Sequence, residues 1–193
     1  MDTAIDLLGG IRQSHQVATS SMPEIPDDLT LVGAARQGDR AAFGQLYRRF
    51  APMVHGILLA RVPHQEADDL VQDVFLSALR RLSMLRDDAS FPAWLAAIAR
   101  NRANDHHRRA VETIELSESV ASGCASGREA LAVLDAICAL PEAYREPLIL
   151  RLVEGMTGNE IAARTGLTPA SVRVNLHRGM KQLRVKLGME RRP

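Results

Sequence analysis

The pattern of apolar and polar positions is clearest near the C-terminus, where it predicts two short helices joined by a tight turn. Apolar residues recur there at helical spacing, and Gly166 interrupts the pattern as a turn residue does. Thr157 and Glu160 have the spacing of a capping box, in which each side chain satisfies a backbone N–H at the helix start. Thr168, followed by a proline, marks the start of the second helix. The sequence therefore predicts a helix-turn-helix over about residues 157–182.

The second helix of this pair has one apolar face and one basic face. Val172, Leu176 and Leu183 share the apolar face of a helical wheel. Small residues at the tip and cations along the sides suit a helix that enters the major groove of DNA. A solvated surface helix is the alternative interpretation of the same charges. The expected DNA-binding residues of this helix are Ser171, Arg173, Val174, His177, Arg178 and Lys181.

The rest of the pattern divides the chain into a tail, two helical domains and a linker. The linker is acidic and then rich in glycine and serine, and the tail contains paired glycines and prolines. We expect the tail to be disordered, and either Met1 or Met22 is the true start. The expected parts are the tail at residues 1–27, a first domain at 28–110, the linker at 111–128 and a second domain at 129–190. Helices of the first domain are expected at about 29–37, 40–61, 66–83 and 91–109, with Asp39 capping the second.

Composition supports a helical protein. Aromatic residues make up 4% of the chain, and alanine, leucine and arginine dominate, which favours an all-α fold of two small domains. The net charge of +1 does not indicate nucleic acid, but residues 168–193 hold seven Lys or Arg and a single glutamate. No apolar run is long enough to span a membrane, and the N-terminus is unlike a signal peptide. Cys124 and Cys138 have no metal or redox spacing, so we expect a cytoplasmic protein.

The third predicted helix of the first domain has an acidic outer face with a leucine in it. Asp69, Gln72, Asp73 and Leu76 follow one another at the spacing i, i+3, i+4 and i+7. A leucine among carboxylates predicts a docking surface for a protein partner that has basic and apolar groups. An ordinary solvated acidic face is the alternative.

The fourth predicted helix sets a polar side rich in arginine against an apolar face that includes Trp94, which we expect to pack in the core. Arginine and asparagine are the side chains that pair with phosphates and base edges. This helix therefore predicts a second nucleic-acid surface. Its expected DNA-binding residues are Arg100, Asn101, Asn104, His107 and Arg108.

The sequence contains no pattern that indicates catalysis or metal binding. His64 with Asp68, and the pair His106-His107, have no further ligand at matching spacing. A nucleophile–base arrangement, a phosphate-binding glycine loop and an HExxH motif are all missing from the sequence. We therefore expect no enzymatic activity, no metal site and no cofactor.

Three segments in order resemble the extracytoplasmic-function (ECF) group of bacterial RNA polymerase sigma factors. ADDLVQDVFLSAL is similar to the polymerase-docking segment of that group, and FPAWLAAIARNRANDHHRR is similar to its promoter-melting segment. The segment from LPEAYREPLIL to GMKQLR resembles its C-terminal helix-turn-helix domain. The resemblance covers about residues 28–188.

The resemblance implies a protein that binds core RNA polymerase and promoter DNA and is held by an anti-sigma factor. The first domain would read the minus-10 element, with residues 85–90 holding a flipped base, and the second would read the minus-35 element. The clamp helices of the largest polymerase subunit would meet Asp69, Gln72 and Asp73. Promoter DNA would meet Arg100, Asn101 and Asn104.

Two positions depart from the family, and two rival functions stay open at this point. The group often has a basic residue at Asn175 and usually alanine at Gly179, where glycine costs about 1 kcal/mol of helix stability. The main rival is a stand-alone helix-turn-helix regulator that acts without polymerase, although the chain has no evident dimer helix. A weaker rival is a metal-dependent nuclease built on Asp68, Asp69 and Asp73.

Overall fold

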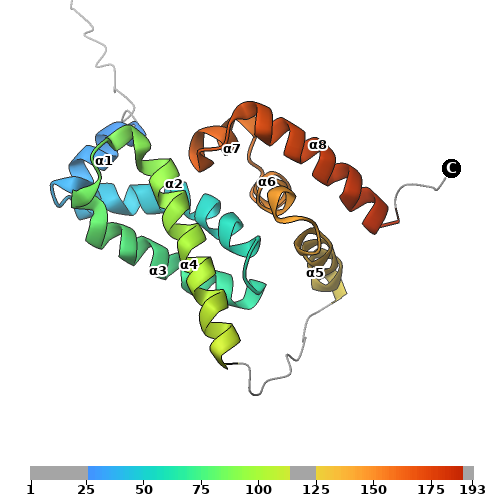
Figure 1. The fold of residues 1–193 in the computed structure, drawn as a ribbon. Helices are drawn as coiled ribbons and strands as arrows, with labels where there is room; N and C mark the ends of the chain where they lie inside the picture. The colour runs from blue at the N-terminus through green and yellow to red at the C-terminus, as the bar shows by residue number, and fades with distance from the viewer. Residues whose placement is uncertain (1–25, 114–124, 189–193) are drawn as a thin grey trace, which may run out of the picture.

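The computed structural model describes residues 26–113 and 125–188, and in this part of the chain the regular structure is helical (Figure 1). The described part does not include residues 1–25 of the predicted tail or residues 189–193. It also does not include residues 114–124 of the predicted linker, among them Cys124. The first unit contains α1 (Asp28–Arg36), α2 (Arg40–Leu59), α3 (His64–Arg81) and α4 (Phe91–Thr113), with 3-10 turns at Leu82–Met84 and Asp88–Ser90. The second unit contains α5 (Ala125–Cys138), α6 (Glu142–Leu152), α7 (Gly158–Thr165) and α8 (Pro169–Lys186).

Four helix ends lie where the local sequence signals predict. The Asp39 side chain accepts hydrogen bonds at the start of α2, and the capping box between Thr157 and Glu160 opens α7. Thr168 caps α8, and Gly166 ends α7 with a φ of 77°, a left-handed conformation that favours glycine. These expectations are confirmed. The helices also extend into the segment expected to be the linker, because α4 runs to Thr113 and α5 begins at Ala125.

Helix α2 is the centre of the first unit. It packs against α1, α3 and α4, and Leu46, Phe50 and Ile57 on it are fully buried. The Phe50 ring meets the Phe91 ring of α4 edge-on at 5.4 Å between centroids. Trp94 packs against the same core, as expected. The apolar face of every helix in this unit is therefore directed at α2.

In the second unit α6 has the corresponding central position, and α8 lies across it because Gly179 has no side chain. A Cβ atom at Gly179 would lie 2.9 Å from Cδ1 of Leu148 and 3.0 Å from Cβ of Tyr144. The glycine that local propensity marks as unfavourable therefore permits close packing of α6 against α8. Local helix propensity alone misses this role.

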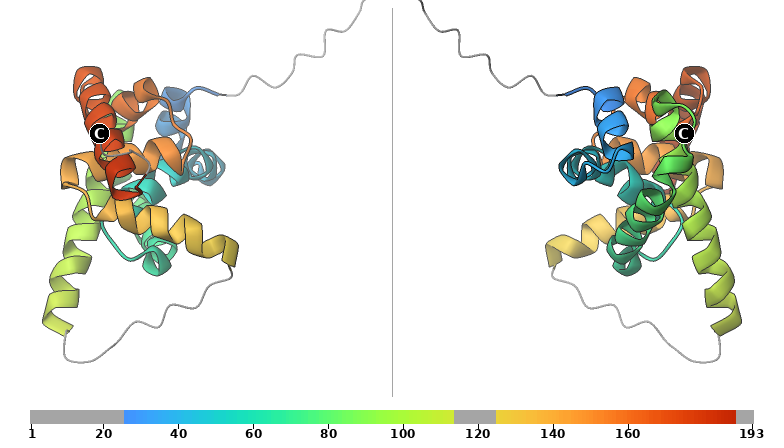
Figure 2. Two further views of the ribbon diagram at one scale, coloured as in Figure 1. Left: turned by 90° about the vertical axis from the view of Figure 1, so that its right-hand side faces the viewer. Right: turned by 90° about the vertical axis from the view of Figure 1, so that its left-hand side faces the viewer.

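The two units lie against each other rather than apart (Figure 2). Helix α2 packs on α6, and α4 packs on α7. A Cβ atom at Gly56 of α2 would lie 2.7 Å from Cδ2 of Leu150 and 3.0 Å from Cγ of Glu154, so this glycine also permits a close approach. The Cys138 thiol donates to the carbonyl of Leu59 at 3.5 Å, and burial raises the pKa of this thiol. The buried apolar residues of both units form one continuous cluster.

An ion pair with a titratable partner also joins the units. Nδ1 of His55 on α2 lies 2.7 Å from a carboxylate oxygen of Glu154, and its Nε2 lies 3.6 Å from Asp68 of α3. The hydrogen bond to Glu154 raises the pKa of His55, and the charge of Asp68 adds to the shift. Tyr47 and Arg48 line the same hollow. The protonated form of His55 is therefore favoured when the two units are docked.

The glycine at position 179 provides a first test. Gly179→Ala is expected to destabilise the protein by about 1–3 kcal/mol, because the added methyl group overpacks the contact with Leu148 and Tyr144. Gly44→Ala is the control, since a Cβ there meets nothing within 4 Å. The control should gain about 0.5–1 kcal/mol from helix propensity. Urea unfolding measures the free energy of unfolding of both variants. Equal changes in this free energy for Gly179→Ala and Gly44→Ala would contradict the packing role of Gly179.

The pair between His55 and Glu154 predicts a pH dependence of stability. A group whose pKa is raised by folding stabilises the folded state below its unpaired pKa, about 6.5 for histidine, and loses that contribution as pH rises through the raised value. The difference in thermal stability between the parent and Glu154→Gln should therefore be largest near about pH 6 and shrink as the pH rises through the raised pKa of His55. A difference that grows with pH would contradict this assignment.

Candidate nucleic-acid and partner interfaces

The outer face of α3 presents three of its four expected docking residues to solvent. Asp69 and Gln72 are exposed, and Leu76 is 51% exposed. Asp73 differs, because its carboxylate pairs with the guanidinium of Arg102 on α4 and is half-buried. This intramolecular pair fixes α3 against α4, and the chain spacing gave no indication of it.

Two further exposed apolar residues, one on α3 and one in the turn that follows it, were not predicted from the sequence. Leu79 lies one helical turn beyond Leu76 and is also exposed, and Met84 in the following 3-10 turn is 76% exposed. The i, i+3 spacing of Leu76 and Leu79 was the signal that could have identified the first of them. We define Leu76, Leu79 and Met84 as the apolar strip. Exposed apolar side chains beside Asp69 and Gln72 are the composition expected of a protein interface.

The polar side of α4 presents most of its expected DNA-binding residues. Asn101, Asn104 and Arg108 are exposed, and Arg108 also pairs with Asp105 three residues earlier. His107 is exposed too, but Nε2 of its ring bonds to the carbonyl oxygen of Arg61. The side of α4 that faces solvent therefore keeps two amides and one guanidinium available for a ligand.

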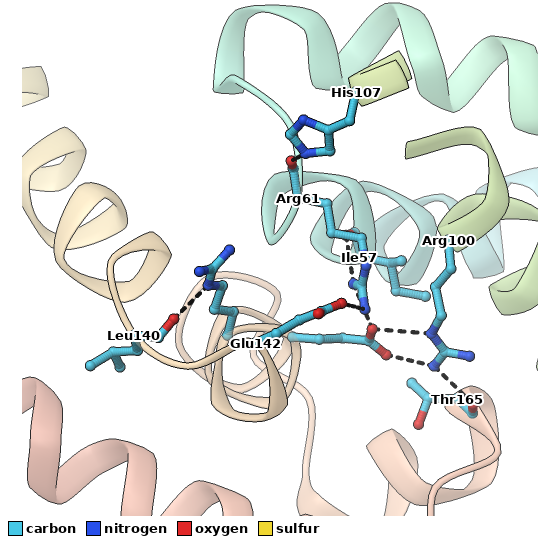
Figure 3. Close-up of polar contacts among 9 residues, drawn as sticks. Ile57, Arg61, Arg100, His107, Leu140, Glu142 and Thr165 are labelled. Atoms are coloured by element: carbon cyan, nitrogen blue, oxygen red, sulfur yellow. Dashed lines mark hydrogen bonds and ion pairs between the residues drawn. The ribbon is translucent and has the colours of Figure 1, made fainter. Parts of the chain in front are cut away.

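Arg100 has a different environment, since its guanidinium binds the second unit. Its Nη2 donates to Oε1 of Glu146 at 2.6 Å and to the carbonyl of Thr165 at 3.0 Å, and its Nε donates to Oε2 of Glu146 at 3.1 Å. Arg61 donates from Nη1 to the same carboxylate at 2.7 Å. Figure 3 shows Arg61 and Arg100 reaching from the first unit toward α6.

Glu146 is therefore a buried carboxylate shared by two arginines. It is only 4% exposed, whereas Glu142, one turn earlier on α6, is 72% exposed in its side chain and lies 3.5 Å from Arg61. A buried carboxylate is stable only when it is paired and hydrogen-bonded, and Glu146 satisfies both conditions through the first unit. Sequence analysis did not identify Glu146, because periodicity does not show which distant cations a glutamate meets.

Helix α8 keeps its basic face free in the second unit. Val172 and Leu183 are buried in the expected apolar face, and Val174 on the opposite side is 41% exposed. The Ser171 hydroxyl accepts a hydrogen bond from Thr168, which caps the helix. The remaining expected residues are exposed: Arg173, His177, Arg178 and Lys181. The helix-turn-helix thus presents an exposed basic surface on α8, and its Arg178 and Lys181 border a hollow that Leu140 and Tyr144 also line.

Two further properties limit the chemistry of the described residues. Within residues 26–113 and 125–188, no group of three or more histidine, cysteine or acidic side chains is placed to hold a metal ion. His106, one of the histidines considered as a ligand, pairs with Glu66 instead. Among the same residues, none of the helices combines the length and hydropathy that a membrane crossing requires.

Comparison with known proteins matches both units to one family. Residues 46–113 match the family model of sigma-70 region 2, and residues 130–183 match that of sigma-70 region 4. The RNA polymerase sigma factor CarQ of Myxococcus xanthus is 35% identical over 162 residues, which cover 79% of this chain and 93% of CarQ. The ECF RNA polymerase sigma-E factor of Escherichia coli is 32% identical over 182 residues, covering 84% and 95% of the two chains.

A solved structure agrees with these relatives. It is the sigma factor RpoE of Bartonella quintana in complex with the anti-sigma factor NepR, at 25% identity and a TM-score of 0.57. The match covers 77% of this chain and 98% of the RpoE chain. Both helical units and their order along the chain thus agree with one group of proteins. The chain belongs to the extracytoplasmic-function group of RNA polymerase sigma factors.

Proposed function

We propose that this sigma factor docks on core RNA polymerase through the outer face of α3 and reads promoter DNA with α4 and α8. The observation that carries the proposal is the separation of surfaces: an acidic and apolar face on α3, and a basic face on α8. A protein that acts on DNA alone has no need of an acidic and apolar docking face such as the one on α3. Family membership likewise favours the sigma factor over the stand-alone regulator.

The docking site consists of Asp69, Gln72 and the apolar strip, with Asp73 at its edge. Exposed carboxylates beside leucine and methionine side chains complement a partner surface of arginines and apolar residues. The pair between Asp73 and Arg102 gives Asp73 a positioning role, since it holds α3 against α4. Asp69 is thus the better carboxylate for a direct contact with polymerase.

The docking site can be tested with one charge reversal. Asp69→Lys is expected to weaken binding to core polymerase on the order of tenfold, because a cation would face the basic groups of the partner. Asp135→Lys on α5 is the matched control, since Asp135 is also an exposed helical carboxylate and the change in charge is the same. Fluorescence titration with purified core polymerase measures both affinities. Equal affinities for the two variants would refute this docking site.

The promoter contacts divide between the two units. On α4, the minus-10 element would meet Arg100, Asn101, Asn104, His107 and Arg108. Residues 85–90 would hold an extruded base, whose unstacking costs a few kcal/mol. On α8, the basic face is proposed for the minus-35 element. There Val174 would meet a thymine methyl group, and Arg173 and Arg178 would meet base edges or phosphates.

The minus-35 role is tested by truncating one arginine. Arg173→Ala should lower run-off transcription from a promoter selected from a random library, with a loss of about 1–3 kcal/mol if Arg173 contacts a base. Arg184→Ala, an exposed arginine near the end of the same helix, is the control. The effect of Arg173→Ala should vanish on a template whose minus-35 element is already mutated. An equal loss on both templates would contradict a base-specific contact.

The proposal also covers the cellular location of the protein, its lack of enzymatic activity and its regulatory partner. We propose that the protein acts in the cytoplasm with polymerase, as a transcription initiation factor and not as an enzyme. We also propose an anti-sigma factor as a regulatory partner. The RpoE structure from Bartonella quintana contains such a complex, and the apolar strip here is exposed in the free chain, which supports a covering partner.

A further inference from the structure

The buried carboxylate of Glu146 binds Arg100, a side chain that is also proposed to meet promoter DNA. Nε and Nη2 of Arg100 already donate three hydrogen bonds to Glu146 and to the carbonyl of Thr165. Neighbouring Asn101 and Asn104 on the same helix remain exposed. A carboxylate and a phosphate are both bidentate acceptors for a guanidinium, so Glu146 occupies Arg100 as a DNA phosphate would.

Other contacts indicate that the docked arrangement of the two units is specific. Arg164 of α7 lies over the Phe50 ring at 5.3 Å and donates to the carbonyl of Arg49 at 3.2 Å. Glu154 pairs with His55, and Gly56 leaves room for Leu150. The interface thus combines cation–π contact, paired charges and close packing.

A cavity between the units supports the same conclusion. It measures about 360 Å³, and Arg61, Arg100, Glu146 and Asn175 of α8 line it. A cation in place of Asn175 would repel both Arg61 and Arg100, so the neutral amide of Asn175 favours the docked arrangement.

The connection between the units is long enough for them to separate. Helix α4 ends at Thr113 and α5 begins at Ala125, so 11 residues (114–124) join them. A chain of that length spans up to about 40 Å when extended. The covalent link therefore permits both a docked and an open arrangement.

We propose that Glu146 is an autoinhibitory latch that holds the two units together and keeps Arg100 from DNA until polymerase separates them. The proposal rests on the proposed function in one respect, the promoter role of Arg100. The free chain then binds DNA weakly through α4, because only the open fraction has Arg100 available. Opening of the latch by polymerase would couple promoter recognition to holoenzyme assembly.

The first measurement reports closure without DNA. The Cys138 thiol is half-buried and donates to the carbonyl of Leu59 across the interface, so its rate of alkylation by iodoacetamide reports separation of the units. Cys124 is replaced by serine, which leaves Cys138 as the one thiol of the chain. Glu146→Gln is expected to speed this alkylation and to increase the radius of gyration in solution scattering. Circular dichroism confirms that helical content is kept.

The second measurement reports access to Arg100. The probe is a fluorescein-labelled DNA duplex of mixed sequence with an unpaired central bubble. Glu146→Gln should raise the affinity of the free, full-length chain for it by about tenfold, because apparent affinity scales with the competent fraction. Glu142→Gln removes the same charge from an exposed position of the same helix and should change affinity by less than about twofold. In an Arg100→Ala background, Glu146→Gln should give no gain.

The outcomes separate the latch from the proposed function. An unchanged rate of Cys138 alkylation in Glu146→Gln overturns the latch. A faster rate without any DNA gain, or with a DNA gain that persists without Arg100, overturns the masking of Arg100. Transcription by holoenzyme carrying Arg100→Ala then decides the other question. A loss of transcription there supports the promoter role of Arg100, and no loss refutes that role independently of the latch.

Discussion

The arrangement of the whole molecule depends on neutralising one buried carboxylate. Removing a carboxylate from water costs several kcal/mol unless cations and hydrogen bonds compensate. Glu146 obtains that compensation from Arg61 and Arg100, which both belong to the first unit. The position of α6 against α2 and α4 therefore follows from a charge requirement as much as from apolar packing. Charge pairing fixes geometry more narrowly than apolar contact does, because hydrogen bonds are directional.

Two helical glycines make this arrangement sterically possible. Gly56 allows α6 to approach α2, and Gly179 allows α8 to approach α6. Each lies inside a helix, where glycine lowers local stability by up to about 1 kcal/mol. The local loss is offset by tertiary contacts that a methyl group would block. Helix α6 is thus packed closely on two sides, between α2 of the first unit and α8, the helix proposed to read DNA.

Local features of the fold could be predicted from the sequence, and relations between distant residues could not. The capping box at Thr157, the N-cap at Asp39 and the turn at Gly166 depend on neighbours within a few positions, so the residues themselves reveal them. Exposure of Asn101 and Val174 follows from helical periodicity. The pairing of Arg100 depends on a glutamate 46 positions away, and that of Asp73 on Arg102 from another helix. Periodicity assigns a residue to a face, but it does not reveal what the face meets.

The short connection between α4 and α5 affects how strongly the two units must attract each other in order to stay associated. Eleven residues confine the second unit to a small volume around the first, which corresponds to an effective concentration in the millimolar range. Two separate fragments with a dissociation constant of about 0.1 mM would hardly associate at cellular concentrations, yet on one chain they would be associated about nine-tenths of the time. A modest interface is therefore sufficient to keep the molecule compact. The free energy that holds the two units together is then small, so a large partner that binds both of them can separate them.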